Sequence, residues 1–126
     1  MNNVALTAGY VASKGLVLSG DTLTLNFLLK CSGGPSTVTY FLEFSEDGVT
    51  WYAEVAEEDA GKGVVSMPKV VRTFADNNGT AIADNAAFAV SCQFKRRMLM
   101  ARVQMAASAG TVLVTSLTAP YGIIAQ

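Results

Sequence analysis

The sequence predicts an all-β fold: an antiparallel β-sandwich, jelly-roll-like, with seven to nine strands in a single domain. Apolar and polar residues alternate at period two along most of the chain, turn-forming residues separate these segments at roughly ten-residue spacing, and no segment has a convincing helical period. A chain of 126 residues can build one domain with one core. We therefore treat residues 1–126 as one sandwich domain, whose uncharged termini we expect to be extended and to form interfaces.

The strongest strand patterns lie in the first half of the chain. Residues 21–30 and 37–45 each place an apolar row on one face, and Gly33-Gly34-Pro35-Ser36 predicts the turn between them. The second strand ends at Ser45-Glu46-Asp47-Gly48. Because Asp-Gly is a strong hairpin signal, residues 49–55 are expected to return as a strand.

The second half continues with the same period. Residues 64–74 predict an extended segment that Pro68 places at an edge or divides, and residues 88–94 alternate again. Residues 97–107 and 111–118 predict a hairpin. The first strand of this hairpin is expected to have two faces, one with Leu99, Ala101, Val103 and Met105 and the other with Met98, Met100, Arg102 and Gln104.

The chain is poor in charge. Charged residues make up 15% of it, against about 25% in an ordinary soluble domain. Seven of the ten acidic residues lie in 43–59, seven of the nine basic residues lie in 62–102, and the first 13 and last 24 residues carry none. The two groups either pair within one fold or meet across copies in an oligomer, and the bare ends suggest surfaces that are covered in use.

Composition also excludes several classes of function. With no histidine, Ser-His-Asp and Cys-His catalysis and histidine-ligated metals are impossible, and the carboxylates cluster at turns, where they are usually solvated. We therefore expect no enzyme, cofactor or metal site. A net charge of −1 argues against a general nucleic-acid binder, and polar residues with Pro120 in the uncharged C-terminal stretch argue against a membrane span. Cys31 and Cys92 are either free or bridged to each other.

Several side chains are candidates for contact with a partner. Lys95-Arg96-Arg97 is the densest basic run, either a solvated strand end or a contact with an acidic partner. Met98 and Met100 are expected to share a mixed face with Arg102, as subunit interfaces often do. Trp51 and Tyr52 should point to opposite faces, with one in the core and one exposed. The predicted interface residues are Tyr52, Lys95, Arg97, Met98, Met100 and Arg102.

The segment from Tyr40 to Tyr52 resembles a hairpin with the pattern S-x-D-G-x-x-W, found in β-sandwich proteins of tailed-phage particles and in discoidin-like carbohydrate-binding domains. Ser45, Asp47, Gly48 and Trp51 occupy the four motif positions. In such a hairpin, Asp-Gly supplies the positive φ angles and the Trp packs back over the turn. The small-residue-rich remainder looks like phage head-decoration (cement) proteins or small tail proteins.

This resemblance implies a non-enzymatic structural protein of the virion, in first place a capsid decoration protein. Its partners would be the major capsid protein and copies of itself, as a homotrimer, with no specific nucleic acid and no membrane. A small tail or neck protein of a phage is one alternative. The other is a carbohydrate-binding β-sandwich module in which Trp51 or Tyr52 stacks on a sugar ring.

Overall fold

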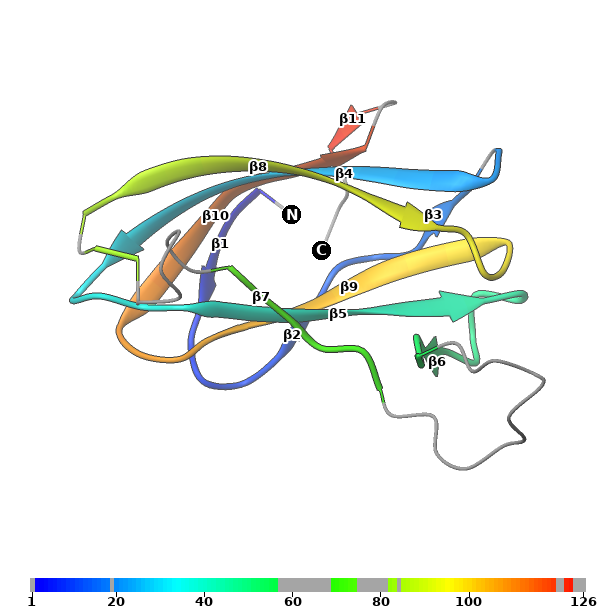
Figure 1. Ribbon diagram of the computed structural model, residues 1–126, viewed down its shortest axis with the longest axis horizontal. Coiled ribbons are helices and arrows are strands. Elements are labelled where there is room, and N and C mark those ends of the chain that lie inside the picture. The colour runs from blue at the N-terminus through cyan, green and yellow to red at the C-terminus, as the bar shows by residue number, and fades with distance from the viewer. Residues whose placement is uncertain are drawn as a thin grey trace.

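A computed structural model describes residues 2–18, 20–56, 69–74, 82–83, 85–119 and 122–123. Figure 1 shows that these residues form two antiparallel sheets packed face to face, and no helix forms among them. The predicted β-sandwich is therefore confirmed. In the described ranges, seven strands have three or more residues, and four have only two residues. No helix in the described part of the chain is long and apolar enough to cross a membrane.

The first sheet has four strands side by side and a short fifth strand on one of them. Their order is β1 (Asn2–Leu6), β10 (Thr111–Ala119), β4 (Thr22–Ser32) and β8 (Ala87–Lys95), with β11 (Gly122–Ile123) paired to β10. Leu6 is fully buried, so the N-terminal strand belongs to the sandwich. β8 forms one edge of this sheet.

The second sheet is built around two long strands, each flanked by short ones. The long strands are β9 (Met100–Ala107) and β5 (Val38–Ser45). The short strands are β2 (Val11–Ala12) and β3 (Leu16–Val17) on the free side of β9, and β6 (Tyr52–Ala53) and β7 (Arg72–Phe74) on the free side of β5.

Period-two alternation places the core between the sheets, as the sequence predicts. On β4 every second residue from Leu23 to Leu29 is apolar and buried, whereas the residues between them are half-buried or exposed. Aromatic rings fill the centre of the sandwich. Tyr40 stacks on Phe74 with 4.5 Å between ring centroids, and Phe27 meets the Phe74 ring at 5.0 Å. Burial of these large rings is a main contribution to stability.

The predicted hairpin of residues 97–107 and 111–118 is wrong. β9 pairs with β5 in the second sheet, whereas β10 pairs with β4 and β1 in the first, so the turn between them crosses the sandwich. Gly110 makes this crossing possible: its φ is +56°, and a Cβ atom there would lie 2.8 Å from the carbonyl oxygen of Ser32. Alternation determines which face of a strand is buried, but it does not determine the neighbouring strand.

The predicted faces of this strand also need a correction at its start. β9 begins at Met100, so Met98 and Leu99 lie in the turn that precedes it. Met98 packs against the core instead of sharing the outward face, and Leu99 is exposed. From Ala101 onward the alternation is as predicted. The predicted segment 64–74 is described only in part, because residues 64–68 lie outside the described residues.

Candidate functional site

The turn with the S-x-D-G-x-x-W pattern is held by its own polar side chains. Asp47 Oδ1 accepts hydrogen bonds from the backbone N–H groups of Val49 at 2.8 Å and Thr50 at 2.9 Å. Ser45 Oγ accepts from the N–H of Gly48 at 2.8 Å and donates to Asp47 Oδ1 at 3.1 Å. The hydrogen bonds that Asp47 accepts, first of all the one from Thr50, lower the pKa of its carboxyl group below the usual value.

β5 and β6 flank this turn as an antiparallel hairpin, as the sequence predicts. Only the glycine of the Asp-Gly pair has a positive φ: Gly48 has φ +76°, and Asp47 is not in the left-handed region. The aspartate therefore acts as a hydrogen-bond acceptor for the turn, and the glycine provides the backbone conformation. The motif is thus accounted for by local structure.

Trp51 packs on the outer face of the second sheet, outside the core between the sheets. The guanidinium of Arg102 lies over its ring, 4.5 Å from the centroid. A Cβ atom on Gly15 would lie only 2.7 Å from Cη2 of the indole, so the β2–β3 connection passes directly against Trp51. Tyr52 is 55% exposed. Tyr52 is therefore the exposed member of the predicted pair, but the expected core ring is wrong, because Trp51 is half-buried on the outer face.

Three polar residues of the outward row of β5 and β9 form a packed cluster beside Trp51. Arg102 Nε donates to Glu43 Oε1 at 2.8 Å, and Gln104 Nε2 donates to the same oxygen at 2.9 Å. Glu43 and Arg102 are direct cross-strand partners. Met100 is half-buried on this face, beside Gly15 and Gly48. Met100 and Arg102, both predicted interface residues, therefore already make contacts within the chain.

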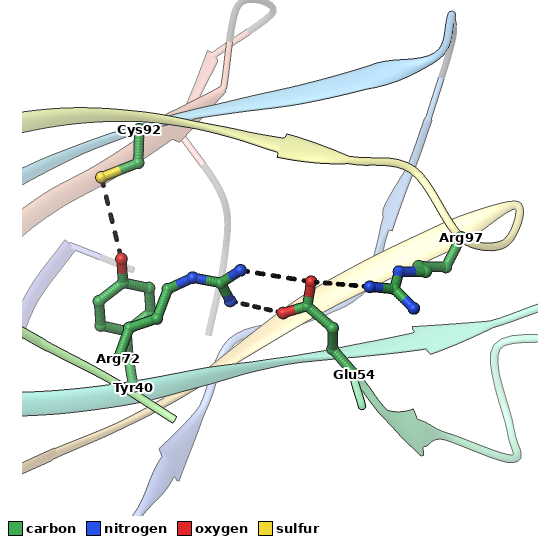
Figure 2. A network of polar contacts seen from close by, with 5 residues as sticks. All are labelled: Tyr40, Glu54, Arg72, Cys92 and Arg97. Carbon is green, nitrogen blue, oxygen red and sulfur yellow. Dashed lines mark hydrogen bonds and ion pairs between the residues drawn. The ribbon is translucent and has the colours of Figure 1, made fainter. Parts of the chain in front are cut away.

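A second ionic cluster lies at one open edge of the sandwich (Figure 2). Glu54 is 5% exposed, and its carboxylate accepts hydrogen bonds from both terminal nitrogens of Arg72, the longer of which is 3.3 Å. Arg97 Nη2 approaches the other side of the carboxylate at 3.6 Å. The hydrogen bond to Glu54 raises the pKa of Arg72, so the guanidinium stays charged. Together with Glu43–Arg102, these contacts show acidic and basic residues pairing within one fold.

The backbone on both sides fixes Glu54 in this position. Its N–H donates to the carbonyl of Leu42 at 2.9 Å, and its carbonyl accepts from Val70 at 2.9 Å. The sequence pattern did not reveal this buried carboxylate. Arg72 also lies over the ring of Phe94, 4.7 Å from its centroid, so the cluster joins the edge of the second sheet to β8 of the first.

The same edge contains one cysteine. The hydroxyl of Tyr40 donates to Cys92 Sγ at 3.9 Å, and burial raises the pKa of Tyr40 well above its usual value (Figure 2). No disulfide joins Cys31 to Cys92, so the bridged alternative is wrong. Cys92 packs with the apolar residues at the edge of the core, as a small hydrophobic side chain does.

At one end of the sandwich, the β8–β9 turn lies beside the start of β4 and the end of β5 (Figure 1). Four of the predicted interface residues line two depressions at this end, namely Tyr52, Lys95, Arg97 and Met98. A depression of about 580 Å³ there is lined by Asp21, Glu46 and the residues from Lys95 to Leu99. A neighbouring depression of about 340 Å³ shares Arg97 and Met98 and is also lined by Tyr52 and Glu54. We call these two depressions the turn-end hollows.

Arg96 connects the turns at this end. Its Nε donates to the carbonyl of Met98 at 2.9 Å, and its Nη1 donates to the carbonyl of Gly20 at 3.1 Å. The backbone N–H of Arg96 donates to Asp21 at 2.9 Å. Arg96 therefore holds the turns together through hydrogen bonds. The turn-end hollows are lined by both acidic and basic side chains, which suits a polar contact with a partner. Among the described residues, no group of three or more Cys, Asp or Glu side chains could hold a metal ion.

Comparison with protein-family models, with curated proteins and with solved structures found no match to this chain.

Proposed function

We propose that the protein is a non-enzymatic structural component of a virus particle, in first place a decoration protein that binds the capsid lattice and copies of itself. The main support is the outer face of the first sheet. Its central positions carry neutral side chains, namely Thr24, Asn26 and Leu28 on β4 and Ala89, Ser91 and Gln93 on β8.

Charge is confined to the ends of this face. Lys30 and Lys95 lie at opposite ends of the β4–β8 ladder, and Leu28 is 44% exposed between them. The centres of protein interfaces are depleted in charged residues, and a sheet face of small neutral residues can pack closely against another surface. Elsewhere, ion pairs within the chain occupy the carboxylates of Glu43 and Glu54. Carboxylates held in this way favour a structural protein over an enzyme.

The test uses gradient-purified virus particles from the biological source of the sequence. Mass spectrometry should find the chain in the particle band, and immunogold labelling should place it on the head. Labelling of the tail or neck would replace decoration by the tail-protein alternative. Absence of the chain from particles, with the chain present in the infected-cell lysate, would contradict the proposal.

Carbohydrate binding is the second candidate, and the exposed Tyr52 favours it. This ring borders the smaller turn-end hollow, where Glu54 and Arg97 provide polar groups. Arg102 already covers Trp51, so Tyr52 is the better stacking surface. A glycan array with wild-type protein and Tyr52→Ala tests this candidate: binding that the substitution abolishes without lowering the melting temperature supports it, and an array with no bound glycan rejects it.

A further inference from the structure

Among the described residues, β8 is an edge strand of the first sheet, and we call its side away from β4 the open side. It extends from Ala87 to Lys95, and within the described part of the chain it pairs only with β4. Proteins normally protect such edges with proline, inward-pointing charge, a bulge or a short strand. β8 has nine residues, no proline and an unshifted register, and its single charge is its last residue.

The register shows which backbone groups face the open side. Cys31 N–H donates to Ala86 at one end of the ladder, and Arg96 N–H donates to Asp21 at the other. Because hydrogen-bonded and non-hydrogen-bonded pairs alternate in an antiparallel ladder, even-numbered residues of β8 bond to β4. Odd-numbered residues, including Ala89, Ser91 and Gln93, therefore direct their N–H and C=O groups away from the sheet.

We propose that two copies of the chain pair through β8, antiparallel about a two-fold axis at Ser91, and so join their first sheets into one continuous sheet. In this register Ser91 faces Ser91 of the other copy, and Ala89 faces Gln93. Each of these odd-numbered pairs can exchange two backbone hydrogen bonds. Lys95 lies opposite Ala87, so no like charges meet, and shifting the register by two residues would leave the ends of the strands unpaired.

The inward row of β8 identifies a second copy as the occupant. Phe88, Val90 and Cys92 are only half-buried, although they face the core. Across the proposed two-fold axis, Val90 lies opposite Cys92 and Phe88 lies opposite Phe94. Every inward pair is then apolar and every outward pair is free of charge repulsion, so the strand is complementary to itself on both faces.

This contact does not require the virion role, and it differs from the homotrimer implied by the resemblance. Sedimentation velocity of the wild-type protein should show a reversible monomer–dimer equilibrium. Ser91→Lys places two lysines opposite each other and should raise the dimer dissociation constant roughly fivefold, as should Ser91→Glu with two carboxylates. Mixing the two variants should restore association as a heterodimer.

Asn26→Lys is the matched control, because Asn26 is the β4 neighbour of Ser91 on the same outer face. It adds the same charge one strand away from the edge and should leave the dissociation constant within about twofold of wild type. The proposal is overturned by a protein that stays monomeric at about 1 mM, where even a contact of about −4 kcal/mol is populated. A trimer, equal effects of the two lysine substitutions, or no recovery in the mixture would also overturn it.

Discussion

Glu54→Gln should lower the free energy of unfolding by about 2–3 kcal/mol. The Glu54 side chain is 4% exposed and receives two nitrogens of Arg72 and one of Arg97. Removing one partner of a fully buried ion pair costs about 3–5 kcal/mol. The two arginines are 31% and 25% exposed, so water can solvate part of the freed charge, which places the expected loss below that range. For a domain of this size, the melting temperature should fall by roughly 6–15 °C.

The assay is urea unfolding followed by the fluorescence of Trp51, the single tryptophan, with circular dichroism as a second probe of two-state behaviour. Glu46→Gln is the matched control, because it removes the same charge from an exposed side chain at the same end of the sandwich. It should change stability by no more than about 0.5 kcal/mol.

A double substitution separates charge pairing from packing at the same position. Replacing Glu54 with Leu and Arg72 with Met removes both charges together, and it should recover most of the stability that Glu54→Gln loses. If Glu54→Gln unfolds at the same urea midpoint as Glu46→Gln, the ionic cluster does not hold the edge of the sandwich and the reasoning is refuted.

Two further perturbations test the motif turn and its surroundings. Gly15→Ala should cost about 1–3 kcal/mol in urea unfolding and shift the emission of Trp51, since the new Cβ would overlap the indole. Gly9→Ala has nothing within 4 Å and should stay within about 0.5 kcal/mol of wild type; equal losses in the two variants would contradict the close approach. Because backbone N–H groups lower the pKa of Asp47, the stability it contributes is present above the ordinary carboxyl pKa of 3.8 and is lost as pH falls through the lower folded value. The amide proton of Thr50, followed by NMR, should titrate with a midpoint below 3.8, and a midpoint at or above it would refute this hydrogen-bonding scheme.

The fold class could be predicted because period-two alternation reports local geometry. An alternating row such as Leu23, Leu25 and Phe27 specifies one buried face whatever strand lies beside it. Strand pairing depends on contacts between segments far apart in the sequence. The turn at Ser108–Gly110 therefore looked like a hairpin, although Gly110 leads the chain across to the other sheet.

The site divides in the same way. The motif predicts the turn because Ser45, Asp47 and Gly48 are close in sequence and form hydrogen bonds with one another. The burial of Glu54 could not be predicted, because it depends on two arginines that only the folded sheets bring together. The open side of β8 also follows from sheet order, which alternation does not encode.

Amide hydrogen exchange along β8 tests the self-pairing of this strand most directly. The N–H groups of Val90 and Cys92 bond to β4 and should be protected at every protein concentration. The N–H groups of Ala89, Ser91 and Gln93 face the open side, so they should exchange rapidly in dilute protein and become protected as concentration rises. Rapid exchange of these three amides at all concentrations, with Val90 and Cys92 protected, would contradict pairing through β8.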